Sequence, residues 1–303
     1  MSSLPAESQD TSGAGILLDP APSADRAVPV TERRKLGLAS WLSIGWLLLV
    51  LFGAVFAGLL PIAGPNAVDV SATAQGPGLH HLLGTDELGR DILSRLVYGS
   101  RTSLIVGMFS VVIGITVGGL LGVMAGYFRG RVDAITSLLI NVMLAFPALI
   151  FALAAAAFLG PSLVNVVGII AILSIAPYAR FIRGIAWGAA QREYVTAARM
   201  LGYRSGRILL REVVPNIMPA MLSFAFVSMG IAIAVEGALS FLGLSVRPPT
   251  PTWGNMIAEG GSYLTVVPLL SVWPALCLLI TILALNVVGE LLRRRFDVRE
   301  GGL

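Results

Sequence analysis

The side chains best suited to chemistry in this sequence are a few polar residues scattered among long apolar runs. They form no familiar catalytic motif, because the sequence has no Gly-x-x-x-x-Gly-Lys-[Ser/Thr], no Gly-x-Ser-x-Gly and no His-Glu-x-x-His. The first of these motifs is the loop with which P-loop ATPases hold the phosphates of ATP. We therefore expect no catalytic residue in this chain and no nucleotide bound by it.

A metal site is conceivable only near His80 and His81, which lie close to Asp86 and Asp91. Imidazole and carboxylate ligands suit zinc or nickel. Adjacent histidines on a loop rarely converge on one ion, however, and no His-x-x-x-His spacing is present. The single cysteine, Cys277, excludes a disulfide within the chain and a cysteine-based zinc site. We expect no metal ligand in this chain.

Four charged residues, Asp86, Arg90, Asp91 and Arg95, alternate in sign at spacings of four and five. One interpretation is a salt-bridged, solvated surface helix that is capped by Thr85. The other is a contact for a partner protein or a brace on a gate. The pattern itself does not choose between them.

The elements that must position these residues follow from the composition. Of 303 residues, 56% are hydrophobic and 13% are charged, about half of the roughly 25% typical of soluble domains. So few polar residues cannot cover a soluble globule, so we expect lipid to surround most of the surface. The net charge of +4 comes from short basic blocks between apolar runs. No contiguous basic face with aromatics is present, which argues against nucleic acid as a partner.

Six apolar runs predict an all-α integral membrane protein with six transmembrane helices, because a bilayer core needs roughly 20 residues of helix. The runs are 36–60, 104–126, 135–159, 164–181, 217–240 and 266–292. We expect a disordered tail over 1–35, a first span over 36–60, an external segment with an amphipathic helix over 61–101, a five-helix core over 102–292 and a tail over 293–303. The core contains an internal loop over 181–215 and an external loop over 241–265.

The basic residues predict the orientation of the spans. With both termini in the cytoplasm, 17 of the 21 Lys and Arg residues fall in the tails and internal loops. This distribution fits the positive-inside rule. The three long connecting segments, 61–101, 181–215 and 241–265, are candidates for function, because long loops in compact proteins are usually functional.

The internal loop predicts two short helices with a glycine corner between them. Tyr194, Ala197, Ala198 and Leu201 lie at i, i+3, i+4 and i+7 and form a narrow apolar stripe. Gly202 can take the left-handed conformation that ends a helix. Ser205 can cap the second helix, and Pro215 is expected to break that helix at the membrane. The shape suits docking in a groove of a cytoplasmic partner, although an amphipathic helix resting on lipid headgroups is the alternative.

Ala197-Ala198-xxx-Gly202, with Pro215 thirteen residues after the glycine, resembles the "EAA loop" of bacterial ABC importer permeases. That resemblance implies a coupling helix seated in a cleft of an ATPase subunit. The acidic residue of the general pattern is replaced by Thr196, with Glu193 lying further upstream. Glu212 stands where the pattern has isoleucine.

External segments resemble the dipeptide and oligopeptide permeases of the "C" type. The first is Leu83-Gly-Thr-Asp86-Glu-Leu-Gly-Arg90-Asp91, and the second is Phe241-Leu-Gly-Leu-Ser followed by Pro248-Pro-Thr-Pro-Thr-Trp253-Gly-Asn-Met. The C-terminal stretch Asn286-Val-Val-Gly-Glu290 is similar as well. The resemblance covers about residues 36–299.

This resemblance implies a type I ABC importer permease fold in a prokaryotic cell membrane. The implied partners are a homologous second permease, two ATPase subunits or domains that bind ATP and Mg²⁺, an extracytoplasmic substrate-binding protein, a peptide substrate and membrane lipid. The implied coupling-loop residues are Glu193, Thr196, Ala197, Ala198, Gly202, Arg204, Arg207 and Pro215. The implied residues of an external gate or binding-protein contact are Asp86, Arg90, Asp91, Arg95 and Trp253.

Two polar residues inside predicted spans, Asn141 and Glu236, are candidates for the translocation path. A carboxylate near mid-membrane costs roughly 2.5–3.5 kcal/mol on insertion scales, so Glu236 should face protein or water. We favour a structural or gating partner for Glu236 over a substrate ligand. A nickel or other small-solute permease remains an alternative function, and an integral membrane enzyme is a more distant one.

Overall fold

The computed structural model describes residues 37–300, with side chains to residue 295. The predicted tail over 1–35 and the last three residues lie outside this part. The described elements are α1 (Leu38–Phe56), η1 (Val70–Ala72), α2 (Ile92–Phe128), α3 (Gly130–Ala145), α4 (Ala148–Leu159), α5 (Leu163–Ala190), α6 (Glu193–Met200), α7 (Ser205–Ile208), η2 (Leu209–Val213), α8 (Val214–Phe241), α9 (Trp253–Gly261) and α10 (Leu269–Glu300). Within 37–300 there is no strand, only two isolated bridges, so the all-α prediction is confirmed.

Five of the described helical stretches are long and apolar enough to cross a membrane, or six if one bent pair counts as a span. The bent pair is α3 and α4, whose axes differ by 78°. The predicted span over 135–159 is therefore two helices with a sharp bend at Pro147. The helix stops at Phe146 because a residue followed by proline, here Pro147, is pushed out of the helical region.

Glycines allow α2 and α5 to pack closely along most of their lengths. A Cβ added at Gly122 would lie 2.6 Å from the Ala179 carbonyl oxygen, and one at Gly126 would lie 2.6 Å from that of Arg183. No larger residue fits at these positions without moving the backbone of α5. The small residues of α2 therefore set the distance between the two helices, as expected in a membrane bundle.

The helix boundaries correct three predictions. α2 begins at Ile92 instead of residue 104, and α5 runs to Ala190 instead of 181. Arg183, which the sequence placed in the internal loop over 181–215, consequently lies within a membrane-spanning helix, as Arg180 does. The described part of the predicted C-terminal tail over 293–303 continues α10 as helix to Glu300.

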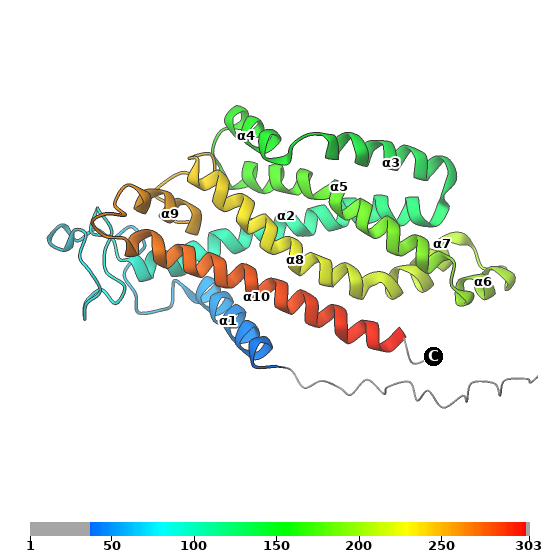
Figure 1. Ribbon diagram of the computed structural model, residues 1–303, viewed down its shortest axis with the longest axis horizontal. Helices are drawn as coiled ribbons and strands as arrows, with labels where there is room; N and C mark the ends of the chain where they lie inside the picture. The colour runs from blue at the N-terminus through cyan, green and yellow to red at the C-terminus, as the bar shows by residue number, and fades with distance from the viewer. Residues whose placement is uncertain (1–36, 301–303) are drawn as a thin grey trace, which may run out of the picture. The chain divides into compact units, whose positions relative to one another are not determined.

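The short elements gather at opposite ends of the bundle. Figure 1 shows α6 and α7 at one end, and α9 with the segment 61–91 at the other. α1 lies beside α10, where the Trp46 indole Nε1 donates to the Thr281 hydroxyl at 2.9 Å. Any signal between the two ends must therefore pass along the long helices.

Candidate functional site

Gly202 forms the corner of the internal loop, as predicted. Its φ is +77°, in the left-handed region that favours glycine. The amide of Gly202 donates to the Arg199 carbonyl at 3.0 Å, and that of Tyr203 donates to the Ala198 carbonyl at 3.1 Å. This pair of hydrogen bonds is the Schellman motif. The corner therefore gives α6 a defined end and α7 a defined direction.

The predicted apolar stripe on α6 is divided between two faces. Val195 and Ala198 are buried in a cluster with Tyr127 of α2, Ile208 of α7 and Val213. In contrast, the side chains that remain exposed on α6 and its end are those of Tyr194, Ala197, Met200 and Leu201. Ala198 therefore attaches α6 to the bundle, while the exposed face is available to another protein. Glu193 and Thr196 are exposed on the same helix.

Two details of the loop prediction are wrong. Ser205 does not cap α7, because Arg204 is the N-cap residue and no side chain caps the helix. Pro215 does not break the chain into two helices, since the helical stretch runs from Ser205 to Phe241 through the π turn η2. Pro215 directly follows the π turn η2, where the backbone already departs from the regular α-helical hydrogen-bond pattern that a proline would interrupt. Arg207 covers the Tyr203 ring, with 4.5 Å from the guanidinium to the ring centroid.

At the opposite end, the expected amphipathic helix is absent from the described segment 61–91. Asp91 is the N-cap of α2 and accepts from the Ser94 amide at 2.8 Å. Its other oxygen is 2.9 Å from Nδ1 of His81. Thr85 does not cap a helix, because its hydroxyl donates to the Ala72 carbonyl. Turns replace a helix here because Gly84 and Gly89 both take positive φ.

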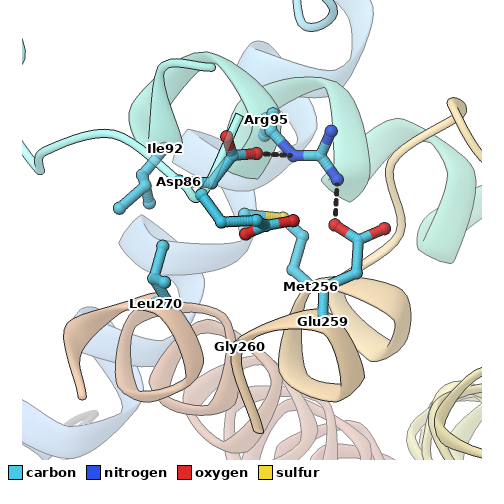
Figure 2. A pocket seen from close by; sticks show the side chains of 8 residues that line it. Asp86, Ile92, Arg95, Met256, Glu259, Gly260 and Leu270 are labelled. Atoms are coloured by element: carbon cyan, nitrogen blue, oxygen red, sulfur yellow. Dashed lines mark hydrogen bonds and ion pairs between the residues drawn. The ribbon is translucent and has the colours of Figure 1, made fainter. Parts of the chain in front are cut away.

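Asp86, Arg90 and Arg95 form a buried ion-pair cluster with Glu259 of α9, shown in part in Figure 2. Arg90 Nε is 2.5 Å from Asp86 Oδ2, and Arg95 Nη2 is 2.7 Å from Glu259 Oε2. The Arg95 residue is only 2% exposed. The solvated-helix interpretation is therefore wrong for Asp86, Arg90 and Arg95. Their burial also excludes them as surface contacts in this conformation.

Glu259 was not singled out from the sequence, because 164 residues separate it from Arg95. Only the fold brings α9 against the start of α2. Burial raises the pKa of the Glu259 carboxyl, and the attraction of Arg95 and Arg90 opposes that rise. Asp86, Glu87 and Glu259 lie close enough to suggest a cation site. However, Arg90 and Arg95 already pair with these carboxylates, so the cluster acts as a brace between α2 and α9.

Glu236 of α8 is fully buried and accepts hydrogen bonds from serines of three segments. Its Oε1 accepts from Ser240 at 2.6 Å and from Ser245 at 3.0 Å, and its Oε2 accepts from Ser103 of α2 at 3.3 Å. The Ser103 hydroxyl in turn accepts from the Trp253 amide at 3.4 Å. We call Glu236 and these three serines the outer clasp, because they join α2, α8 and the loop before α9.

Trp253 lies beside the outer clasp and is 1% exposed. Its indole Nε1 donates to the Leu96 carbonyl at 3.1 Å. An external contact through the Trp253 side chain is therefore contradicted in this conformation. The residue instead packs α9 onto the start of α2.

Asn141, the other candidate for the translocation path, is exposed on α3 and accepts from Arg180 Nη2 at 3.0 Å. One turn along α5, Arg183 forms an ion pair with Asp133 of α3, with Nη2 3.0 Å from Oδ2. The sequence placed Arg183 in the internal loop and Arg180 at the end of the fourth apolar run, and neither pair was foreseen. The structure thus provides an exposed face on α6 at one end, buried ion pairs at the other and polar pairs between α3 and α5.

Comparisons with known proteins agree with this geometry. The family model described as "Binding-protein-dependent transport system inner membrane component" matches residues 118–301. The "Glutathione transport system permease protein GsiD" of Pectobacterium atrosepticum is 37% identical over 88% of this chain and 87% of its own length. The "Di/tripeptide transport system permease protein DppC" of Pseudomonas aeruginosa is 40% identical over 83% and 85%. The "Dipeptide transport system permease protein DppC" of Alkalihalophilus pseudofirmus is 34% identical over 88% and 86%.

A solved structure described as "Inward facing conformations of the MetNI methionine ABC transporter" has a similar fold. Its TM-score is 0.56 at 14% identity, and the match covers 68% of this chain and 97% of that chain. The exposed loop on α6, the glycine corner and the membrane-spanning helices are the features expected of such a permease. This chain therefore belongs to the family of inner-membrane components of binding-protein-dependent transport systems, the permease subunits of ABC importers.

Proposed function

We propose that this chain and a homologous second permease together form the membrane path of an ATP-driven importer of di- or oligopeptides. Three similar permeases are named for glutathione, dipeptides or di/tripeptides, and each of these is a short peptide. The partners are two ATPase subunits or domains, which hold ATP and Mg²⁺, and a substrate-binding protein on the outer side. Both termini of this chain lie in the cytoplasm, in agreement with the positions of its basic residues.

The observation that carries this proposal is the exposed apolar face of α6, held at a fixed angle by the corner at Gly202. A soluble ATPase can bind such a face, which includes Ala197 and Leu201, without disturbing the buried side of the helix. Arg204 and Arg207 are exposed next to it and can contact acidic groups of the ATPase. The coupling loop is therefore the place where ATP-driven movement enters this chain.

The packing explains how that movement reaches the membrane. Because Val195 and Ala198 are buried against Tyr127, displacement of α6 must move the cytoplasmic end of α2. The continuous helical stretch Ser205–Phe241 also joins the coupling loop directly to the outer clasp at Glu236. Packed elements tend to move as rigid bodies between discrete arrangements. Alternating access then follows from a tilt of these helices, while the ion-pair brace keeps α9 on α2.

The test is reconstitution of this chain with its permease mate, ATPases and binding protein in liposomes. We expect ATP-dependent uptake of a labelled dipeptide, and no uptake when this chain alone is omitted. An intact complex with ATPase activity that imports no peptide would refute the peptide proposal. Nickel and other small solutes, offered to the same liposomes, would then be the substrates to examine.

A further inference from the structure

We propose that Arg180 binds the terminal carboxylate of the peptide in the cytoplasmic half of the translocation path. This inference rests on the proposed function, which supplies the peptide substrate. The residue lies within α5, one of the membrane-spanning helices, and its side chain is exposed. Its interaction with Asn141 of α3, at 3.0 Å, is with a neutral amide. This contact therefore places no negative charge beside the Arg180 guanidinium.

The depth of this pair follows from helix geometry. Asn141 lies eleven residues after Gly130, where α3 begins at the cytoplasmic end, so it is about 16 Å along the helix. The backbone of Ala179, next to Arg180, packs against Gly122 of α2. Gly122 is six residues before the end of α2, about 9 Å along that helix. Arg180 therefore lies about 9–16 Å from the ends of α2 and α3 that adjoin α6, within the apolar helix α5.

A positive charge within an apolar span is costly when it faces lipid, and for arginine the cost reaches roughly 2.5–3.5 kcal/mol at the bilayer centre on insertion scales. Arg183, one turn away, shows how a structural arginine is accommodated in this bundle, because it is neutralised by Asp133. Arg180 has no acidic partner within 37–295. A charge that the fold places at depth and leaves unneutralised is suited to an anion that comes and goes.

The surroundings of Arg180 leave room for such an anion. Pro177 on the preceding turn is exposed, and a Cβ added at Gly184 on the next turn would meet no atom within 4 Å. The planar guanidinium offers paired donors that match the two oxygens of a carboxylate. Asn141 accepts from Nη2, which carries two hydrogens, so the second one can pair with the hydrogen of Nε or of Nη1 to face the two oxygens of a carboxylate. Every unmodified peptide carries a terminal carboxylate whatever its side chains, so this contact would serve substrates of differing sequence.

The experiment compares uptake of a dipeptide with uptake of its C-terminal amide by the complete reconstituted complex. The binding protein is the same throughout, so only the change in the carboxylate-to-amide ratio between variants is interpreted. Arg180→Gln keeps a donor for Asn141 but removes the charge. Asn141→Asp leaves the arginine in place and neutralises it with a fixed carboxylate. Arg180→Lys retains the charge, and Arg131→Gln removes an exposed arginine at the start of α3 as a matched control.

We expect Arg180→Gln and Asn141→Asp each to lower the carboxylate-to-amide ratio by about tenfold, the factor that corresponds to about 1.4 kcal/mol. Arg180→Lys should keep most of the ratio, and Arg131→Gln all of it. An unchanged ratio in the first two variants would overturn the inference while leaving peptide import intact. Loss of the second permease from the purified Arg180→Gln complex would also overturn it, because Arg180 would then pair with an acid of that subunit. If the wild-type complex hydrolyses ATP but imports neither compound, the proposed function itself fails.

Discussion

Replacing Glu236 by alanine should release the loop before α9 from the bundle. The carboxyl group accepts three hydrogen bonds, from Ser103, Ser240 and Ser245, and all four residues are at most 2% exposed. Alanine removes the shared acceptor and leaves a cavity among buried hydroxyls.

The cost can be worked from these contacts. A buried hydroxyl that loses its partner costs about 1–3 kcal/mol. Ser240 can still bond the Thr252 hydroxyl at 3.1 Å, and Ser103 still accepts from the Trp253 amide. We therefore count about 1 kcal/mol for each of the three lost bonds and about 1–2 kcal/mol for the cavity, which gives about 4–5 kcal/mol. Glu236→Gln retains an acceptor for Ser240 and Ser245 and should cost only about 1 kcal/mol.

Two measurements on the purified complex in detergent examine this reasoning. The thermal midpoint should fall by about 8–20 °C in Glu236→Ala, if the 2–4 °C per kcal/mol of domains of 150–250 residues applies. Hydrogen exchange should accelerate over 241–256, where the Trp253 amide is held by Ser103. Glu212→Gln is the matched control, and we expect it to stay within about 0.5 kcal/mol of the wild type. If hydrogen exchange over 241–256 is as slow in Glu236→Ala as in the wild type, the outer clasp does not hold this loop.

Three further changes test other parts of the structure. Gly122→Ala places a methyl group 2.6 Å from the Ala179 carbonyl oxygen and should destabilise the α2–α5 contact by about 1–3 kcal/mol in thermal unfolding. The control Gly168→Ala, whose methyl group meets no atom within 4 Å, should not lower the thermal midpoint. Equal midpoints for the two variants would contradict the packing argument. Gly202→Val forces a β-branched residue to a φ of +77°, at a cost of about 1–2 kcal/mol, and should reduce peptide-stimulated ATP hydrolysis in a folded complex. Gly202→Asn should be tolerated, because asparagine adopts the left-handed conformation more readily. Equal stimulation in both variants would show that the conformation at Gly202 is not needed for coupling. Burial raises the pKa of Glu259, which lies in a cluster of three carboxylates and two guanidiniums. The contribution of Glu259 to the free energy of unfolding should therefore be full below the ordinary glutamate pKa and should decline as pH rises through the raised pKa. The thermal midpoint of the wild type minus that of Glu259→Gln, measured as a function of pH, should decrease as pH rises. A difference that increases with pH would contradict this prediction.

Much of the coupling loop could be read from local sequence. The alanines and the glycine of 193–202 predict a short helix and a left-handed corner, because both depend on residues within a few positions of one another. Apolar runs likewise predict membrane spans, since a lipid-exposed backbone must satisfy its own hydrogen bonds. The division of the α6 stripe was beyond such reasoning. Which side of α6 is buried depends on Tyr127 and Val213, which are distant in the chain.

The sequence by itself determined the helical membrane class, the family resemblance and the glycine corner, because each is written in local patterns of residue type and spacing. Only the tertiary structure decided the partners of the isolated polar residues. Glu259 reaches Arg95 across 164 positions, and Ser103 reaches Glu236 across 133. The positions of Arg180 and Asn141 also required the packing of α3 on α5. A charged residue within an apolar run indicates that a partner is needed. Which residue becomes the partner depends on helix packing, and that packing depends on contacts between residues far apart in the chain.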